Sequence, residues 1–400
     1  MSDVHFDCSQ VVILADESAD WKIAGLRQLE RLSLALGEFA ESRAADVKID
    51  IVVLWKPEIP PPARWLPKNS LNTRVRLTES LGSLEPGACI LTTRLFVARN
   101  GLVEFSQAIP AVRIEERIVD VSGTWQQFFE QFEESCRSAT VHSDEEEGWH
   151  FLAEASDIVA SERQLLRRTG KFADGIVSRL LNRPISRSVT RLLLKFPISP
   201  NAWTMSILAV PVVAFFFLVR GEYFGFVAGT TLFQLYNILD GCDGEIARAK
   251  YLDCEKGRRL DALCDLIANL IFILCLGVGL SRQPTVAANL RFIYLLEGVT
   301  SCGLIGGRLA RYVIELVSRD TARIVSRHEE SILDSGQRVF GRALIGFLFQ
   351  MTKRDVAFFG FMVLAIAGKA SWILHLVFVV SVISLLLALM DSISRSRRRV

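Results

Sequence analysis

The fold is decided by one stretch of the chain, Asp240-Gly241-Cys242-Asp243-Gly244-Glu245-Ile246-Ala247-Arg248. It follows one long apolar run, at about 223–240, and precedes another, at about 260–280. A charged side chain at membrane depth costs roughly 2.5–3.5 kcal/mol on insertion scales, so charges there mark functional sites. The pattern therefore predicts two membrane helices that carry a reactive site at their shared end.

Carboxylates recur at helical intervals through this stretch and beyond it. Asp240 and Asp243 stand three positions apart, which places them on one helix face. Gly257, Asp261 and Asp265 follow at intervals of four and share a second face. Four facing carboxylates cannot all stay ionised without cations. Hard oxygen ligands suit Mg²⁺ or Mn²⁺, and we expect two such ions to clamp a diphosphate between the two faces.

Small residues and neighbouring bases bear on this prediction. Gly244, Ala247 and Gly257 add no bulk, which leaves room for a nucleotide against the backbone. An alternative is that the acids form only salt bridges with nearby bases, which are Arg248, Lys250, Arg258 and Arg259. That alternative would account for a single aspartate, whereas the whole spaced pattern favours the metal site.

Long apolar segments continue on both sides of this stretch. They lie at about 202–219, 223–240, 260–280, 286–316, 355–368 and 371–390. A span needs roughly 20 residues, so the fifth is short and is expected to begin nearer Arg342. Basic residues gather before the first segment, after the second and fourth, and in the tail, whereas the opposite loops carry few of them. By the positive-inside rule we predict six spans in the cytoplasmic membrane, with both termini in the cytoplasm.

The first part of the chain has a different pattern. Short apolar runs at 11–15, 49–54 and 88–91 are typical of buried parallel strands, and a helix-period segment lies at 26–36. Strand and helix alternating at this spacing predict a soluble α/β domain. The start of the chain is polar and acidic, without a secretory signal, so we expect this domain to stay in the cytoplasm.

Changes in composition divide the chain into three parts. We predict an α/β domain at 1–145, a linker with a juxtamembrane helix at 146–197, and an all-α membrane domain at 198–400. The linker follows the acidic run 144–147 and turns basic and helical. Its stretch 175–187 can lie along a membrane surface with Leu and Ile in the headgroup layer. An ordinary amphipathic linker helix fits this pattern equally well.

Composition supports the membrane prediction and gives no indication of nucleic-acid binding. Hydrophobic residues make up 50% of the chain, which is high for a soluble protein, and the net charge is only +2, so no nucleic-acid partner is expected. The cysteines show no C-x-x-C pair, and we interpret all of them as free thiols in a reducing compartment. They are Cys8, Cys89, Cys136, Cys242, Cys254, Cys264, Cys275 and Cys302.

The string D-x-x-D-G-x-x-A-R-x(8)-G-x-x-x-D-x-x-x-D at 240–265 resembles the signature of CDP-alcohol phosphotransferases, without a departure. The resemblance covers about 195–390 and implies a six-helix membrane domain, usually a homodimer. It implies metal ligands at Asp240, Asp243, Asp261 and Asp265. It also implies that Asp265 deprotonates the acceptor hydroxyl, and that Gly244, Ala247, Arg248 and Gly257 lie near the CDP moiety.

Other site residues follow from the same resemblance. Pro200-Asn201-Ala202-Trp203-Thr204 resembles the family's P-N-x-x-T opening, where Asn201 and Thr204 would lie near the nucleotide. A plain N-cap is the alternative for Asn201. Basic residues at the cytoplasmic ends of later helices could hold an acceptor phosphate, or could only anchor the helices. They are Arg308, Arg311, Lys353 and Arg354.

The run 11–15 and the segment 22–31 resemble the start of sugar-phosphate nucleotidyltransferases. Those enzymes hold a triphosphate on a glycine-rich loop, where this chain has Asp16-Glu17-Ser18-Ala19-Asp20. Acidic side chains would repel a triphosphate, so we expect a degenerate domain. Joined to the membrane part, it resembles the fused inositol-phosphate cytidylyltransferase and di-myo-inositol-phosphate-phosphate synthase.

The resemblances imply transfer of a phosphoalcohol from a CDP-alcohol to an alcohol or phosphoalcohol acceptor, with release of CMP. CDP-inositol is one candidate donor, and CDP-diacylglycerol, for phospholipid synthesis, is the other. A bifunctional enzyme with an active N-terminal domain, or a non-catalytic membrane scaffold, are the remaining hypotheses.

Overall fold

The computed structural model describes residues 10–43, 48–56, 58–68, 73–78, 88–99, 101–102, 125–141, 148–169, 175–317 and 353–397. The chain forms two compact units. Unit 1 comprises Met1–Thr169, Leu194–Pro197 and Arg248–Tyr251, and unit 2 comprises Gly170–Leu193, Ile198–Ala247 and Leu252–Val400.

A parallel sheet forms the centre of unit 1. Its strands are β1 (Gln10–Ala15), β4 (Ile49–Trp55), β5 (Thr73–Thr78) and β6 (Cys89–Thr92), in the order β5-β4-β1-β6. Val11 lies opposite Ile51 on one side and Cys89 on the other. The central strand β1 is buried along its whole length, as expected for a strand covered on both faces. The predicted α/β domain and its three strands are confirmed.

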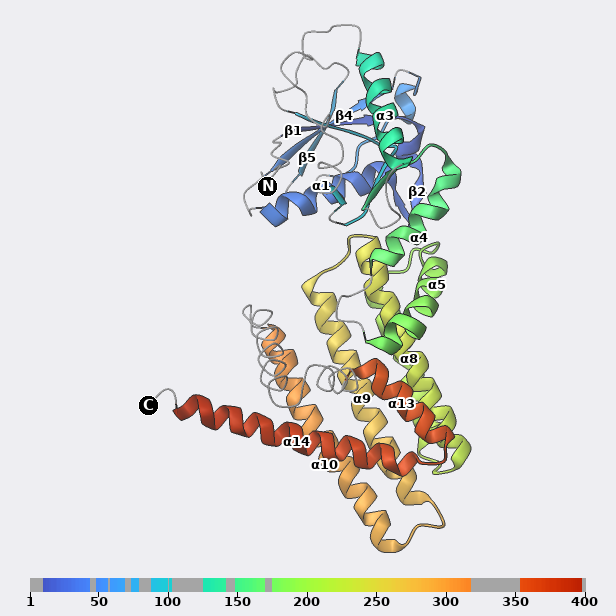
Figure 1. Cartoon of the computed structure of the whole chain (residues 1–400), viewed down its shortest axis with the longest axis vertical. Helices are drawn as coiled ribbons and strands as arrows, with labels where there is room; N and C mark the ends of the chain where they lie inside the picture. The colour runs from blue at the N-terminus through green and yellow to red at the C-terminus, as the bar shows by residue number, and fades with distance from the viewer. Residues whose placement is uncertain are drawn as a thin grey trace. The chain divides into compact units, whose positions relative to one another are not determined.

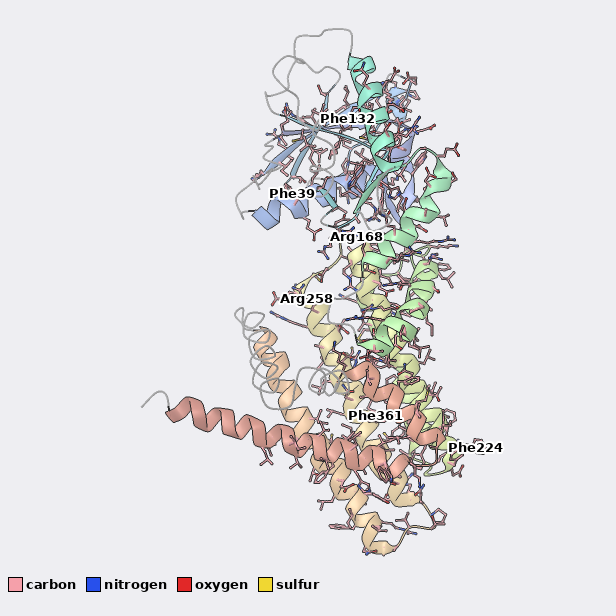
Figure 2. The ribbon with its side chains drawn as sticks, viewed as in Figure 1. Phe39, Phe132, Arg168, Phe224, Arg258 and Phe361 are labelled. Carbon is pink, nitrogen blue, oxygen red and sulfur yellow. The ribbon has the colours of Figure 1, made fainter. Side chains whose placement is uncertain are left out.

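Two helices complete the core of unit 1 (Figure 1). The helix α1 (Gln28–Arg43) buries Leu29, Leu32 and Leu36, at the spacing of one helix face. The helix α3 (Trp125–Val141) contributes Phe132, labelled in Figure 2, to the same core. The helix predicted at 26–36 begins at Gln28, because the preceding residues belong to a hairpin. This hairpin joins β2 (Lys22–Ile23) to β3 (Leu26–Arg27).

Unit 1 continues past residue 145, where the sequence pattern places a boundary. The strand β8 (Trp149–Phe151) pairs antiparallel with β7 (Leu95–Val97). The helix α4 (Ile158–Arg168) is held by the Glu162 carboxylate, which accepts a hydrogen bond of 2.9 Å from Ala24 N. Single 3-10 turns lie at η1 (Glu17–Asp20), η2 (Pro61–Ala63) and η5 (Ala155–Asp157).

The prediction that every cysteine is a free thiol is wrong for Cys89, which is disulfide-bonded. A disulfide needs two Cα atoms within about 7 Å of each other. Spacing along the chain does not reveal such a pair when its members are distant in sequence. Six other cysteines are free among the described residues, as expected.

Unit 2 is helical throughout its described residues. A π-helical turn, η6 (Ser178–Asn182), leads into α5 (Arg183–Leu193), and longer helices follow. They are α6 (Pro200–Ile207), α7 (Ala209–Leu218), α8 (Tyr223–Ala249), α9 (Glu255–Arg282), α10 (Ala288–Val317), α13 (Arg354–Ile366) and α14 (Ala370–Arg397). Each predicted apolar segment coincides with a helix or, for the first, with α6 and α7 together. The break at Leu208 precedes Pro211, whose ring would clash with the carbonyl of Ile207 in a continuous helix.

Two helices of the described residues are long and apolar enough to cross a membrane. They are Pro200–Leu218, formed by α6 and α7, and Glu255–Arg282, which is α9. The helix α8 carries four charged residues near its end, and α13 has only 13 residues. The helical nature of this region is confirmed, and its six-span arrangement remains a proposal.

Aromatic rings and glycines hold the helices of unit 2 together. Phe272 of α9 lies 4.7 Å from Phe233 of α8 and 5.7 Å from Phe361 of α13, between ring centroids. Phe361 is labelled in Figure 2. A Cβ on Gly277 of α9 would lie 3.2 Å from the Cα of Gly298, so the absence of side chains lets α9 and α10 approach closely. Figure 1 shows α14 lying across α10.

Candidate metal and nucleotide site

Three of the four predicted metal ligands come together in unit 2. Asp240 lies near the end of α8, and Asp261 and Asp265 lie one turn apart near the start of α9. Each offers a carboxylate oxygen, and the three oxygens lie within 4.8 Å of one another. The interval of four places Asp261 and Asp265 on one face of α9, and Asp240 of α8 meets them there.

The oxygens of this group fit a hard divalent cation. Among the residues that the structure describes, neither Asp240 Oδ1 nor Asp261 Oδ1 has a hydrogen-bond partner, although both atoms are buried. A buried carboxylate oxygen without a partner costs free energy comparable to a lost charged hydrogen bond. A Mg²⁺ or Mn²⁺ ion held by these carboxylates would satisfy them. We name this group of three, Asp240, Asp261 and Asp265, the carboxylate seat.

An arginine from a distant part of the sequence contacts two members of the seat. The Arg354 guanidinium, at the start of α13, forms ion pairs with Asp240 Oδ2 and with Asp265 Oδ2. Its Nε donates to Asn237 Oδ1 at 3.1 Å. Asp265 also accepts a hydrogen bond from the Tyr236 hydroxyl, at 3.3 Å. The arginine that we predicted for an acceptor phosphate thus neutralises the carboxylates in this structure.

The fourth predicted ligand, Asp243, lies outside the seat. Its Oδ2 accepts a hydrogen bond of 2.5 Å from the Thr204 hydroxyl of α6, and its Oδ1 accepts from Gly244 N. Both Asp243 and Thr204 are buried. The structure thus joins two residues that the sequence assigned to different tasks, one to the metal and one to the nucleotide.

Asn201 is not the N-cap of its helix, so that alternative is wrong. The side chain of Ser199 caps α6 by accepting a hydrogen bond from Ala202 N at 3.2 Å. Asn201 instead faces Gly257 of α9, where a Cβ would lie 3.1 Å from Asn201 Oδ1. Two residues predicted near the nucleotide therefore meet, and the glycine is what allows their approach.

A model of the family described as CDP-alcohol phosphatidyltransferase matches residues 197–326, which contain the carboxylate seat. This region is a CDP-alcohol phosphatidyltransferase domain. The predicted resemblance to the family is confirmed.

Proteins named bifunctional IPC transferase and DIPP synthase are similar to part of this chain. The protein from Archaeoglobus fulgidus is 29% identical over 154 residues, which cover 38% of this chain and 30% of the relative. The protein from Rubrobacter xylanophilus is 35% identical over 141 residues, 35% of this chain and 32% of the relative. That from Thermococcus kodakarensis is 33% identical over 139 residues, 34% of this chain and 31% of the relative. The matches thus span less than a third of the relatives' length.

Three of the bases near the signature of the phosphatidyltransferase domain contact groups outside the seat. Arg258 pairs with Asp253 at 3.3 Å, and Arg259 pairs with Glu255. Lys250 Nζ donates to the carbonyl of Phe196 at 3.3 Å. The salt-bridge alternative named these neighbours, whereas the structure shows Arg354 in that role.

The remaining predicted residues occupy the same helices. Gly244, Ala247 and Arg248 lie in the last two turns of α8, and Lys353 precedes α13 as its N-cap residue. Arg308 and Arg311 belong to α10, but their side chains lie outside the described residues. The roles of these residues toward nucleotide and acceptor stay predictions.

Glu245 is a buried residue of the phosphatidyltransferase domain that the sequence reasoning missed. Its Oε1 accepts from Arg183 Nη1 at 2.9 Å and from Ser186 Oγ at 2.8 Å, and its Oε2 accepts from Thr190 Oγ1 at 2.7 Å. All three donors lie on α5. Glu245 follows Asp243 by two positions, so this network fixes α5 to the helix that carries the acids. In the sequence, Glu245 was visible only as an acidic residue inside the signature without an assigned role.

Several polar side chains of the segment η6–α5 are buried, and several of its apolar side chains are exposed. Asn182, Arg183 and Thr190 are buried, and Gln234 Nε2 of α8 donates to Asn182 Oδ1 at 2.9 Å. Exposed apolar side chains of the segment include Leu180, Leu181, Ile185 and Leu192.

Proposed function

We propose that the chain is a divalent-metal-dependent CDP-alcohol phosphotransferase, which transfers a phosphoalcohol from a CDP-alcohol to a hydroxyl acceptor and releases CMP. The observation that carries this proposal is the carboxylate seat, with its two partnerless buried oxygens, inside the signature of the family. A charged group of this kind has no evident use in a purely structural helix bundle.

The residues of the site support an in-line displacement. Asp265 is the proposed base: its carboxylate takes the proton of the acceptor hydroxyl as that oxygen bonds to the β-phosphorus. The bond from the β-phosphorus to the bridging oxygen breaks, and CMP leaves with that oxygen. Divalent ions, when bound, neutralise charge on the diphosphate and on the group in transfer. Asp240 and Asp261 would hold one ion, and Asp243 would be recruited for a second.

We propose an inositol-type CDP-alcohol as the donor, and an inositol phosphodiester as the product class. The names of the relatives, bifunctional IPC transferase and DIPP synthase, support this choice. The alternative donor is CDP-diacylglycerol, with an acceptor alcohol or phosphoalcohol that gives a phospholipid. Arg308, Arg311, Lys353 and Arg354 are the proposed bases for an acceptor phosphate.

We propose that the nucleotidyltransferase-like N-terminal domain is a degenerate scaffold. In parallel sheets ligands bind beyond the carboxyl ends of the strands where the strand order reverses, here between β1 and β6. At that point Arg94 Nε donates to Asp16 Oδ2 at 2.6 Å, and the Ser18 hydroxyl donates to Asp16 Oδ1 at 2.5 Å. Burial alone would raise the pKa of Asp16, but the bonds from Ser18 and Arg94 outweigh it and hold that pKa below its usual range. A paired anion at this position supports the loss of triphosphate binding.

We further propose the membrane arrangement that the sequence pattern predicts. The domain would cross the cytoplasmic membrane six times, with both termini in the cytoplasm, and would act as a homodimer in contact with lipid. The two helices of sufficient length and apolarity support a membrane location. The exposed apolar side chains of η6–α5 support contact with the headgroup layer.

The proposal is tested by CMP release from the purified full chain with Mg²⁺ or Mn²⁺. CDP-inositol and CDP-diacylglycerol are compared as donors, with inositol, inositol phosphate and glycerol phosphate as acceptors. Release with CDP-inositol supports inositol phosphodiester synthesis, and release only with CDP-diacylglycerol selects phospholipid synthesis. No release with any pair would favour a membrane scaffold over an enzyme.

A separate assay tests the bifunctional alternative. The full chain is given CTP and inositol phosphate, and pyrophosphate release is followed. We expect none. Pyrophosphate release that survives Asp261→Asn would show that the N-terminal domain is an active cytidylyltransferase.

A further inference from the structure

Arg354 takes oxygens that a metal ion in the carboxylate seat would need. Its two terminal nitrogens pair with Asp240 Oδ2 and Asp265 Oδ2, one nitrogen to each carboxylate. Its Nε is fixed separately on Asn237 Oδ1, at 3.1 Å. A guanidinium is planar and presents its donors in a rigid fork, so this arrangement spans two carboxylates as a single cation.

A guanidinium and a divalent ion in this position exclude each other. Both use lone pairs of the same two carboxylates, and both carry positive charge, so their electrostatic repulsion adds to the competition. The oxygens without a partner, Asp240 Oδ1 and Asp261 Oδ1, remain within the same group. An entering cation can therefore first bind these two oxygens. It gains the remaining carboxylate ligands of the seat only after Arg354 moves away.

Asp355, the residue after Arg354, fixes the position of the backbone from which the Arg354 side chain extends. Asp355 Oδ2 accepts a hydrogen bond of 2.7 Å from Ser178 N, at the start of η6. A Cβ on Gly175 would lie 2.4 Å from the same oxygen, so only glycine allows the Asp355 carboxylate to approach so closely. The start of α13 is thereby held between η6 on one side and the seat on the other.

We propose that Arg354 is a cationic latch on the carboxylate seat, displaced from Asp240 and Asp265 when a divalent ion binds, and positioned by the contact of Asp355 with Gly175 and Ser178. This inference rests on the proposed metal site and adds to it a resident competitor. Displacement also frees the guanidinium for a substrate phosphate. Because contacts with the start of η6 position the latch, the metal affinity depends on η6 as well as on the four aspartates.

The latch is tested by the affinity for Mn²⁺ of the purified full chain without substrate, measured by electron paramagnetic resonance. The Asp261→Asn variant identifies the signal that belongs to the seat. We expect Arg354→Gln to bind Mn²⁺ about ten-fold tighter or more, since it removes one charge within a few ångströms. We expect Arg354→Lys to lie between wild type and Arg354→Gln, because a single ammonium cannot bridge both carboxylates as the fork does.

A distant arginine provides the control. Arg282 stands seventeen positions after Asp265 on α9, which is about 25 Å along a helix. The Arg282→Gln variant should bind Mn²⁺ as wild type does. Damage to the fold lowers metal affinity, so a gain in affinity is not explained by a structural role. Equal or weaker binding by Arg354→Gln, with clear binding by wild type, would overturn the latch and leave the metal site intact. Absence of seat binding in both proteins would overturn the metal site and the latch together.

The positioning contact is tested by a second pair of variants. Asp355→Ala removes the acceptor of the Ser178 N–H, and Gly175→Ala forces the carboxylate away. Both should bind Mn²⁺ tighter than wild type, but less tightly than Arg354→Gln. Asp355→Asn keeps an acceptor oxygen and should retain the wild-type affinity. Wild-type affinity in Asp355→Ala would show that Asp355 does not position Arg354.

Discussion

Arg183 and Glu245 form a buried ion pair, with Arg183 Nη1 2.9 Å from Glu245 Oε1. The Glu245 side chain is completely buried and that of Arg183 is 9% exposed. The pair connects α5 to the part of α8 that carries Asp240 and Asp243. The pair therefore holds the acidic end of α8 against α5.

Glu245→Ala should destabilise unit 2 strongly. It leaves the Arg183 guanidinium buried without its counter-charge, and breaking a buried pair in this way costs roughly 3–5 kcal/mol. The measurement is thermal unfolding of the full chain in detergent. The matched control is Glu255→Gln, in an exposed pair with Arg259, which should cost less than about 1 kcal/mol. Equal losses in the two variants would contradict a special role for the buried pair.

Thr204→Val should lower the turnover number with little change in folding. It removes the hydroxyl that donates to Asp243 Oδ2, and a hydrogen bond to a charged group contributes about 1.5–3 kcal/mol. We therefore expect kcat for CMP release to fall roughly ten-fold to a hundred-fold. Thr204→Ser keeps the hydroxyl and should stay near wild type. Full activity in the valine variant would remove Thr204 from the site.

Gly257→Ala should weaken binding of the CDP-alcohol. The new methyl group would lie 3.1 Å from Asn201 Oδ1, so Asn201 must shift from its place beside the signature. We expect KM to rise several-fold, with a smaller change in kcat. Gly360→Ala, on α13, is the control because nothing lies within 4 Å of the added atom. An unchanged KM in Gly257→Ala would show that this contact does not border the nucleotide.

The stability of unit 1 should depend on pH through His150. Burial lowers the pKa of His150 to about 4. The unfolded chain takes up this proton near the usual pKa of about 6.5, but the folded chain does so only near 4, so stability falls as the pH drops through this interval.

Hydrogen exchange of the peptides that contain β8 checks this pH dependence. Protection should decrease from pH 6.5 to pH 4 in wild type, after correction for the intrinsic exchange rate. His150→Gln has no such proton to take up, so its protection should vary less over the same interval. The same profile in both proteins would contradict the assignment to His150.

Local patterns predicted the parts of the fold that depend on near neighbours. The run at 11–15 became the buried strand β1 because a strand covered on both faces needs apolar residues throughout. Asp261 and Asp265 were placed on one face by their interval of four, and the structure agrees. Residue spacing does not predict in this way how two helices pack against each other. The short loop after α8 nevertheless brings Asp240 beside Asp261 and Asp265.

Contacts between distant residues were beyond local reasoning. Arg354 lies more than a hundred positions from Asp240, so nothing in its neighbourhood marked it as the counter-ion of the seat. The disulfide bond of Cys89 likewise had no marker in the residues around it. Glu245 was visible as an acid within the signature, but its partners on α5 belong to a segment that the sequence left open between surface helix and linker.

The most direct test of the central claim, metal-dependent transfer at the carboxylate seat, is CMP release by wild type and by Asp261→Asn. Asp261 is the best choice because its carboxylate makes none of the bonds to Arg354, Tyr236 or Thr204 found among the described residues. With Mg²⁺ and the donor that supports turnover, wild type should release CMP, and chelation of the metal should stop it. Asp261→Asn should fold in detergent as wild type does and lose at least about a hundred-fold in rate. Turnover near the wild-type rate in Asp261→Asn, or turnover unaffected by chelation, would contradict the account.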